Sequence, residues 1–439
     1  MRPAIYILST GTELSSGRSI DTNAPTIARA LAERGFAIAG LGTLPDDRAI
    51  LLREIQHVLE RPEVGGLIMT GGLGPTDDDH TVEVLSELTG KPIIPEPNAL
   101  RKLEIFARRF KRRFNQDSAR RQVRALEGAL VLENKTGLAP GILVDVALTD
   151  ASGQSRSPFV AAMPGVPQEM LRMLDDVLLP ELEKRYPDVG HARRTFHLYG
   201  VGESVFQGAF FGAARGHAAS SEEEAAPITQ DFDFSANFHW GITAGDGQLK
   251  VFFESDDASE LEQLVAMVRN AYPLNYLERS AIDILHVEAQ DYKWQIGAAE
   301  SCTGGLIGKL LTDRPGSSTF FRGSLVTYSN TAKQRLLGVT EDTLQNQGAV
   351  SRECAQAMAR GALSALECDY SVAVTGIAGP GGGTESKPVG TVFLACAHQG
   401  GEGEVHQLNL PLDRDRVRLY TAHLAVFHLL KFIHKVEGR

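Results

Sequence analysis

The residues with the clearest chemical potential lie in Ala298–Gly305, which reads Ala-Ala-Glu-Ser-Cys-Thr-Gly-Gly. A hydroxyl and a thiol adjoin two glycines there, and glycine lets the backbone approach a ligand closely. An apolar run precedes the stretch and a helical pattern from Leu306 follows it, which predicts a strand, a turn and a helix. The helix N-terminus would favour an anion. The pattern indicates a nucleophile beside an anion site, or alternatively a tight turn with a capping Ser or Thr.

Ser301 would need a base, because a serine hydroxyl is a weak nucleophile at its ordinary pKa. No histidine lies in this stretch or in the two loops described next, so the sequence does not support a Ser-His-Asp triad here. A lysine can act as the base when burial leaves its amine neutral, and a tyrosine can relay the proton or stabilise an oxyanion. We predict that Ser301, Tyr328 and Lys333 form an acyl-transfer set. The alternatives are an exposed helix charge for Lys333 and a core residue at a strand edge for Tyr328.

Three predicted strand ends would bring these groups together. Ala298 belongs to the first strand, Ser324–Tyr328 is strand-like, and Ser329 can cap a helix that contains Lys333. A third strand, Tyr370–Val374, leads into a glycine-rich loop. Ligands of such sheets bind beyond the carboxyl ends of the strands, so we predict one site at one edge.

The turn after Ser301 and the glycine-rich loop supply the predicted substrate contacts. The backbone N–H groups of Cys302 to Gly305 could form an oxyanion hole or hold a phosphate. The Cys302 thiol is an alternative nucleophile, and its other interpretation is a small buried hydrophobe. The predicted substrate-binding residues of these two loops are Cys302, Thr303, Gly304, Gly305, Thr375, Gly376 and Gly379.

The first third of the chain repeats the arrangement with acidic residues. The strand Ala4–Leu8 runs into Ser9–Leu14, and the strand Leu67–Met69 runs into Thr70–Asp79. The second loop ends in three consecutive carboxylates, Asp77–Asp79, which exceed what a helix cap needs. The additional carboxylates could bind a hard cation such as Mg²⁺ that bridges to substrate phosphates. The alternative is that they only cap the following helix.

A basic segment, Arg101–Arg124, follows these loops. Phe106, Phe110 and Phe114 recur every four residues, which predicts an amphipathic helix with the phenylalanines in the core and a solvated basic face. A phosphate-facing role for one or two arginines and a nucleic-acid patch are the alternatives. The basic residues are Arg108, Arg109, Lys111, Arg112, Arg113, Arg120, Arg121 and Arg124.

Length and composition set the frame for these motifs. With 439 residues and roughly 150 residues per domain, we predict three domains: α/β over 1–190, a small α+β linking domain over 191–285, and α/β over 286–439. Both α/β domains are expected to be three-layered with mostly parallel sheets. The polar, low-complexity stretch Ala218–Ala226 is predicted to be a mobile loop.

Charge and cysteine content narrow the class of protein. A net charge of −11 argues against direct nucleic-acid binding. No apolar run reaches the ~18 residues of a membrane helix, and the N-terminus does not read as a signal peptide. The four cysteines have no zinc-like spacing, so a reducing cytoplasm is the expectation.

The last third of the sequence resembles the CinA family (competence/damage-inducible protein A). The matching motifs are Ala299–Gly305, Val326–Asn330 with Lys333, Gly348–Ser351, Thr375–Pro380, Lys387–Thr391, and Arg414 with Arg418. The resemblance implies a nicotinamide-nucleotide amidase that needs no cofactor and converts nicotinamide mononucleotide (NMN) to nicotinate mononucleotide and ammonia. It implies that Ser301 is the nucleophile and that Tyr328 and Lys333 assist. Arg414 would contact the substrate phosphate, with a surface ion pair as the alternative.

The first 185 residues resemble the family's molybdopterin-binding-like domain, in which some members hydrolyse ADP-ribose with a divalent metal. The implied nucleotide-site residues are Thr10, Gly11, Glu13, Asp21, Asn23, Gly71, Gly72, Gly74 and Thr76, with Asp78 and Asp79 as metal ligands. Two positions depart from the family pattern: Asp77 replaces a residue that is often His, and Leu138 replaces the usual Thr. These departures weaken the prediction of hydrolase activity in the N-terminal domain and leave the prediction of amidase activity unchanged.

The sequence thus leads to two hypotheses. The first is a cytoplasmic, homodimeric NMN amidase of pyridine-nucleotide salvage, with a metal-dependent ADP-ribose pyrophosphatase domain in front and no membrane or nucleic-acid partner. The second is a non-catalytic protein that binds nucleotides or a pterin and is linked to competence or the DNA damage response.

Overall fold

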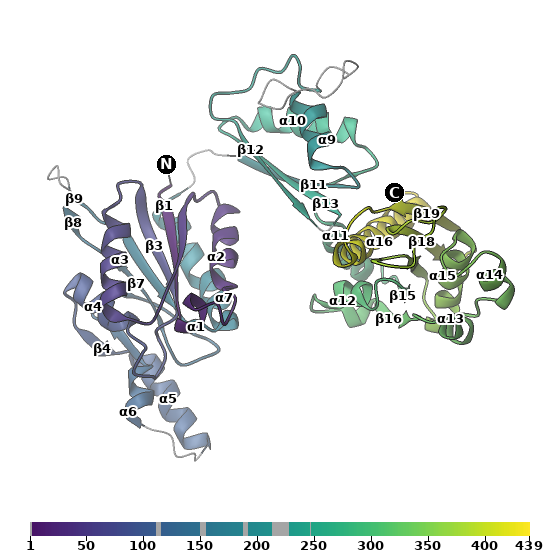
Figure 1. The fold of residues 1–439 in the computed structure, drawn as a ribbon. Helices are drawn as coiled ribbons and strands as arrows, with labels where there is room; N and C mark the ends of the chain where they lie inside the picture. The colour runs from purple at the N-terminus through teal and green to yellow at the C-terminus, as the bar shows by residue number, and fades with distance from the viewer. Residues whose placement is uncertain (1, 111–115, 150–154, 188–191, 213–227, 246) are drawn as a thin grey trace. The chain divides into compact units, whose positions relative to one another are not determined.

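The computed structural model describes residues 2–110, 116–149, 155–187, 192–212, 228–245 and 247–439 (Figure 1). It divides into two compact units, residues 1–190 and residues 191–439. The predicted loop Ala218–Ala226 lies outside the described residues.

The first unit is a six-stranded sheet with the strand order β2-β1-β3-β10-β7-β6. The first four strands of this order are parallel to one another. β7 is antiparallel to its neighbour β10, and β6 is antiparallel to β7. The strands are β1 (Ala4–Thr10), β2 (Ile38–Leu44), β3 (Val64–Thr70), β6 (Leu130–Leu132), β7 (Gly141–Asp145) and β10 (Phe159–Met163). The sheet is therefore mixed, with its parallel part holding both predicted loops.

Helices cover both faces of this sheet, as Figure 1 shows. Alternate residues of β1 point to opposite faces, so Ile7 packs in the core with Ile27, while Leu8 packs in the core with Ile55. This makes the predicted three-layer architecture. The helices are α1 (Thr12–Ser15), α2 (Asn23–Ala32), α3 (Arg48–Glu60), α4 (Thr81–Thr89), α7 (Pro167–Met173) and α8 (Leu179–Arg185), with a π-helical turn at Leu174–Leu178.

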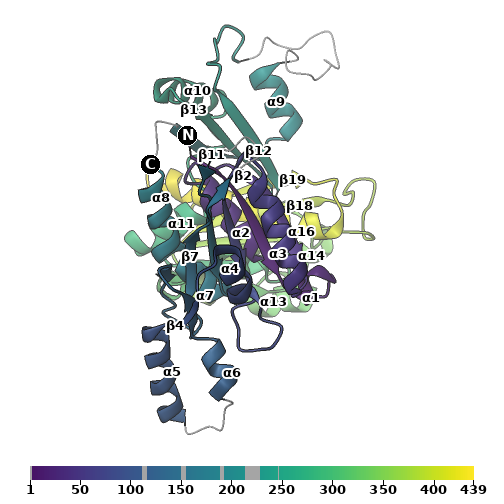
Figure 2. The same ribbon diagram turned by 90° about the vertical axis from the view of Figure 1, so that its left-hand side faces the viewer.

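The basic segment is not one helix. It contains most of α5 (Pro97–Phe110), then α6 (Gln116–Arg121), and ends in a strand that pairs with β4; Figures 1 and 2 both show α5 and α6 beyond β4. Phe106 is 47% exposed, so the prediction of a buried phenylalanine stripe is wrong at that position. The side chains of residues 108–117, which include several of the predicted basic residues, lie outside the described part. The remaining short strands are β4 (Ile93–Pro95), β5 (Arg124–Leu126), β8 (Leu148–Thr149) and β9 (Ser155–Arg156).

The second unit contains an antiparallel sheet with the order β12-β13-β11-β14. Its strands and helices are β11 (Ala192–Tyr199), α9 (Glu203–Phe211), β12 (His239–Gly245), β13 (Gln248–Ser255), α10 (Ala258–Ala271) and β14 (Tyr276–Leu277). Phe196, Phe206, Phe210 and Phe253 are fully buried in its core. This is the predicted α+β architecture.

A five-stranded sheet, β16-β15-β17-β18-β19, forms the rest of the second unit. The three strands β16, β15 and β17 are parallel, and β18 and β19 are antiparallel additions. The elements are α11 (Ala281–Asp291), β15 (Ile296–Glu300), α12 (Leu306–Thr312), a 3₁₀ turn (Ser317–Thr319), β16 (Phe321–Val326), α13 (Asn330–Leu337), α14 (Glu341–Asn346), α15 (Arg352–Leu366), β17 (Tyr370–Gly376), β18 (Thr391–His398), β19 (Gly403–Asn409) and α16 (Arg414–Val436).

Two cores flank this sheet, again giving three layers. Ala298 of β15 packs with α11, α12 and α16, and the next residue, Ala299, packs with α13 and α15. β16 ends at Val326, two residues before the predicted strand end, so Tyr328 lies in a loop. Ser329 caps α13 as predicted, because its hydroxyl accepts the N–H of Ala332 at 3.1 Å.

Two helix-interior glycines allow a direct test of this packing. In α15, a Cβ on Gly361 would lie 2.0 Å from the carbonyl oxygen of Leu337, whereas in α9 a Cβ on Gly208 meets nothing within 4 Å. We expect Gly361→Ala to lower the free energy of unfolding by about 1–3 kcal/mol, because α13 must shift. Gly208→Ala should raise it by up to about 1 kcal/mol through helix propensity. Urea unfolding followed by circular dichroism checks both, and equal effects in the two variants would contradict the packing.

Candidate active site

A serine and a lysine are in contact at the edge of the five-stranded sheet where the parallel strands β15 and β16 end. Ser301 directly follows β15, and Lys333 lies in the first turn of α13. The Nζ atom of Lys333 is 2.9 Å from the Oγ atom of Ser301 and donates to the carbonyl oxygen of Thr327 at 2.8 Å. Ser301 is 8% exposed and Lys333 is 1% exposed. The structure therefore brings together two residues that are 32 positions apart in the sequence.

Burial lowers the pKa of Lys333 from its ordinary value, because an ammonium group loses solvation inside the protein. Among the described residues, no carboxylate forms an ion pair with Lys333 that would restore the charged form. A neutral amine beside a hydroxyl can accept the proton of that hydroxyl. The pair has the geometry of a nucleophile and its base.

Tyr328 occupies a different place from the predicted one. Its side chain is 63% exposed, and its hydroxyl accepts a hydrogen bond from Arg414 at 3.3 Å. Arg414 also donates to the carbonyl oxygen of Gly379 at 2.6 Å, so it links the tyrosine to the glycine-rich loop. None of the hydrogen bonds of the described residues joins Tyr328 to Ser301 or Lys333. A proton relay through Tyr328 would require this side chain to move.

The turn after Ser301 has two of its glycines in the left-handed region, with φ of +61° at Gly304 and +102° at Gly305. The N–H of Gly305 is not available to a ligand, since it donates to the Oε2 atom of Glu300 at 2.8 Å. This corrects the prediction of an oxyanion hole that runs through Gly305. The N–H groups of Cys302, Thr303 and Gly304 meet no oxygen acceptor within the described residues.

Cys302 is buried, and burial raises the pKa of its thiol to about 12. The thiolate is the nucleophilic form of cysteine, so this residue is a poor nucleophile at neutral pH. The structure favours the interpretation of Cys302 as a small buried side chain. Of the hydroxyl of Ser301 and the thiol of Cys302, the hydroxyl is therefore the better candidate nucleophile.

The glycine-rich loop contributes mainly through its shape. The Thr375 hydroxyl donates to the carbonyl oxygen of Ala349 at 2.7 Å, and a Cβ on Gly376 would lie 2.7 Å from Val392, so both residues have structural roles. Gly379 has a φ of +82° and offers its carbonyl oxygen to Arg414.

Two residues that we did not assign from the sequence also hold the site. Arg418 donates to the carbonyl oxygen of Thr303 at 3.0 Å, and Glu300 binds the N-terminus of α12. Arg418 stands one helical turn after Arg414, which is a signal that places both side chains on one face of a helix. Glu300 is a carboxylate at the end of an otherwise apolar strand, which is an unusual position for a charge.

The first unit has a separate cavity of about 380 Å³ at the ends of its parallel strands. Its lining includes eight of the predicted residues, Thr10, Gly11, Glu13, Gly71, Gly72, Gly74, Asp78 and Asp79, together with Asp46, Gln122 and Glu169. Asp21, Asn23 and Thr76 are not in the lining.

The predicted residues outside the lining support the cavity. The Asp21 carboxylate accepts the N–H groups of Asn23 and Ala24 at the start of α2. The side-chain amide of Asn23 donates to the carbonyl oxygen of Gly165 at 2.8 Å. The hydroxyl and N–H of Thr76 both donate to Asp79.

The three consecutive carboxylates of this loop have different surroundings. Asp77 forms an ion pair with Arg121, whereas Asp78 and Asp79 both line the cavity, and Asp79 also accepts hydrogen bonds from Thr76. Within the described residues, no group of three or more His, Cys, Asp or Glu side chains is arranged to hold a metal ion. Carboxylate oxygens are nevertheless the donors that Mg²⁺ prefers, and Mg²⁺ usually completes its shell with water and phosphate oxygens. Asp78 and Asp79 thus fit a cation that a bound phosphate would share, and not a cage made by protein alone.

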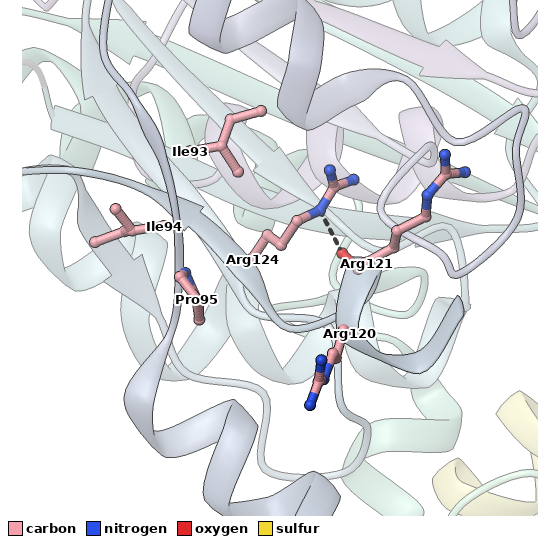
Figure 3. A pocket seen from close by; sticks show the side chains of 6 residues that line it. All are labelled: Ile93, Ile94, Pro95, Arg120, Arg121 and Arg124. Atoms are coloured by element: carbon pink, nitrogen blue, oxygen red, sulfur yellow. Dashed lines mark hydrogen bonds between the residues drawn. The ribbon is translucent and has the colours of Figure 1, made fainter. Parts of the chain in front are cut away.

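A cavity of about 340 Å³ beside this loop is lined by Ile93, Ile94, Pro95, Arg120, Arg121 and Arg124 (Figure 3). Arg121 pairs with Asp77 and Arg124 with Glu83. The three guanidinium groups point in different directions in Figure 3 and do not converge on one point. The predicted phosphate-facing role of these arginines therefore finds no support in their geometry.

Taken as a class, the chain is a two-unit α/β protein with a Ser–Lys pair at a βα junction of its second unit and a glycine-lined cavity in its first. Residues 279–433 match the family model described as the CinA C-terminal domain, and residues 6–184 match the one described as a probable molybdopterin binding domain. The chain belongs to the CinA family.

Full-length relatives support this assignment. A CinA-like protein from Leptospira biflexa is 37% identical over 431 residues, which cover 97% of each chain. A CinA-like protein from Geobacter sp. strain M21 is 36% identical over 432 residues, which cover 98% of this chain and 97% of the relative.

Among solved structures, the competence/damage inducible protein CihA from Agrobacterium tumefaciens is 41% identical and covers 35% of this chain and 93% of its own, with a TM-score of 0.34. Separately, none of the helices in the described residues has the length and apolar character to cross a membrane.

The surroundings of Cys302 predict its reactivity. Raising the thiol pKa from 9.0 to about 12 reduces the thiolate fraction at pH 8 by roughly 1,000-fold. We expect iodoacetamide to alkylate Cys302 far more slowly in the folded protein than in the urea-unfolded protein. Mass spectrometry of the peptide after timed reaction checks this. Alkylation at the rate of a free thiol in the folded protein would contradict it.

Proposed function

We propose that the second unit hydrolyses the carboxamide of nicotinamide mononucleotide, giving nicotinate mononucleotide and ammonia. The observation that supports this proposal is the buried contact of 2.9 Å between Lys333 Nζ and Ser301 Oγ. Membership of the CinA family, through the model match over residues 279–433, adds to it. The choice of NMN and of its carboxamide comes from the resemblance of the motifs, and the pair itself supports acyl transfer through a serine.

In the acylation step, the Oγ atom of Ser301 attacks the carboxamide carbon while its proton passes to the neutral Nζ of Lys333. The C=O electron pair moves to the carboxamide oxygen, and the N–H groups of Cys302 to Gly304 donate to the resulting oxyanion. When this pair returns, the C–N bond breaks, and the nitrogen takes the proton from Lys333 and leaves as ammonia. The product is an ester of Ser301.

Water then hydrolyses this ester by the same sequence. Lys333 removes a proton from the water as it attacks, and the oxyanion again lies at the turn after Ser301. Ser301 leaves with the proton from Lys333, and nicotinate mononucleotide is released. Each residue thus returns to its starting state, and no cofactor is required.

Substrate recognition in this proposal falls to the rim of the site. Arg414 is a cation suited to the phosphate of a mononucleotide. The exposed ring of Tyr328 offers a π-face to the positively charged pyridinium ring, in place of the proton relay that the sequence suggested. The hydrogen bond between these two side chains would keep both at the rim.

For the first unit, we propose a nucleotide site in the cavity of about 380 Å³, with ADP-ribose pyrophosphatase activity as the candidate reaction. A divalent cation bound by Asp78 and Asp79 would neutralise phosphate charge there. Binding without turnover is the second candidate, and the observation that favours it is the lack of a three-ligand acidic cluster among the described residues. The expected cytoplasmic location and homodimer remain predictions.

Substitution of the pair tests the amidase. We expect Ser301→Ala and Lys333→Met each to lower kcat for NMN deamidation by about 10³-fold or more, since nucleophile and base act as one unit. Ammonia release measured with glutamate dehydrogenase checks this. The matched control is Ser317→Ala, which removes a hydroxyl of similar burial that donates to the carbonyl oxygen of Arg314 outside the site, and which should keep most of the activity. Undiminished turnover by Ser301→Ala would remove this residue from the proposed role.

The pH dependence of the reaction tests the base. The active form has a neutral Lys333, so kcat/KM should rise with pH as the ammonium loses its proton and should reach a plateau. Because burial lowers the pKa of Lys333, the midpoint should lie below 10.5. A profile from pH 5 to 10 with NMN as substrate measures it. A rate that falls with rising pH throughout this range would contradict a lysine base.

A further inference from the structure

Glu300 is a buried carboxylate that takes no direct part in the reaction described above. It ends β15 and has 0% exposure. Its Oε2 atom accepts the N–H groups of Gly305 (2.8 Å) and Ile307 (3.1 Å). Its Oε1 atom accepts the N–H of Gly308 (2.9 Å) and the hydroxyl of Ser324 (2.6 Å). Every one of these partners is a donor, which is the complement of an ionised carboxylate.

These bonds divide the N–H groups after Ser301 into two sets. The first set, Gly305, Ile307 and Gly308, points at Glu300. The second set, Cys302 to Gly304 together with Leu306, does not reach Glu300 and meets no oxygen acceptor in the described residues, and the N–H groups of Cys302 and Thr303 face the Cys302 sulfur. A helix N-terminus without an internal acceptor would offer its donors to water or to any anion. The Glu300 carboxylate therefore occupies the N–H groups of Gly305, Ile307 and Gly308 and does not occupy those of Cys302 to Gly304.

We propose that Glu300 is a positioning residue that holds the turn so that the N–H groups of Cys302 to Gly304 receive the oxyanion. The inference rests on the proposed function of Ser301. The main chain of Glu300 extends the same constraint to the base, since its carbonyl oxygen accepts the N–H of Thr327 at 2.8 Å. The carbonyl oxygen of Thr327 in turn accepts from Lys333. Glu300 thereby connects the nucleophile, the oxyanion donors and the base.

Other roles for Glu300 fit the contacts less well. It is not a second base, because it has no exposure and both of its oxygens are engaged by two donors each. It is more than a helix cap, because a cap satisfies donors of its own helix, whereas Glu300 also binds Ser324 on the neighbouring strand β16. The four donors come from the turn after Ser301, the helix α12 and the strand β16.

The test uses a reaction that needs the nucleophile and the oxyanion donors but not NMN. Diisopropyl fluorophosphate phosphorylates an activated serine: the Oγ–P bond forms, fluoride leaves, and the base takes the proton. Glu300→Gln keeps the size of the side chain but replaces one acceptor oxygen by an NH₂ group that faces N–H donors. We expect this variant to react at Ser301 about 100-fold more slowly than the wild type.

The matched control is Ser324→Ala, which removes one donor from the same carboxylate and leaves its three backbone bonds. It should react within about five-fold of the wild type. With NMN, Glu300→Gln should lower kcat by about the same 100-fold factor and leave KM within about two-fold, because only the transition state uses the oxyanion donors. A general loss of structure would change KM as well.

Melting temperatures accompany these rates. If Glu300→Gln does not fold at the assay temperature, Glu300→Asp replaces it, since the shorter carboxylate cannot reach both the N–H groups at the start of α12 and the Ser324 hydroxyl on β16. A folded Gln or Asp variant that reacts within about three-fold of the wild type would overturn the proposal, and so would failure of both variants to fold. A wild-type protein that does not react at Ser301 would instead refute the proposed nucleophile, so the two failures are distinguishable.

Discussion

The site depends on a lysine amine that is buried beside a serine without a carboxylate to neutralise it. A charged ammonium in such a place loses its hydration, and within the described part of the chain a carbonyl oxygen and a hydroxyl are its hydrogen-bond partners. The free energy of burial therefore favours the neutral amine, which is the form a base requires. Among the described residues no carboxylate pairs with Lys333, and every other lysine there is at least partly exposed.

That arrangement is maintained by backbone hydrogen bonds around it. Glu300, the residue before Ser301, holds the start of α12 with its side chain and Thr327 with its carbonyl oxygen. Thr327 then holds Lys333. Because the parallel strands β15 and β16 are neighbours, these contacts are short, although the residues are far apart in the sequence. The sheet register thus determines the distance between Ser301 and Lys333.

The two units use the same structural feature for different chemistry. Both place glycine-rich loops at the carboxyl ends of parallel strands, where the backbone can approach a ligand. In the second unit the loops surround a buried hydroxyl and amine, which suits attack on a neutral amide. In the first unit they surround an open cavity with carboxylates such as Asp46, Asp78 and Glu169 in its lining, which suits a cation shared with phosphates. In addition, an ion pair between Asp77 and Arg121 links the acidic loop to the end of α6.

The sequence by itself determined the α/β class, the strand–turn–helix junctions and the family, because apolar periodicity, glycines and capping residues such as Ser329 act over a few neighbouring positions. It also brought Ser301 and Lys333 together as candidates. Only the tertiary structure decided that Tyr328 lies beside Arg414 and that the N–H of Gly305 is hydrogen-bonded to Glu300, whose carboxylate holds the turn. These properties depend on burial and on contacts between separate strands and helices. Local patterns do not encode them, since a side chain's pKa and partners follow from what packs around it.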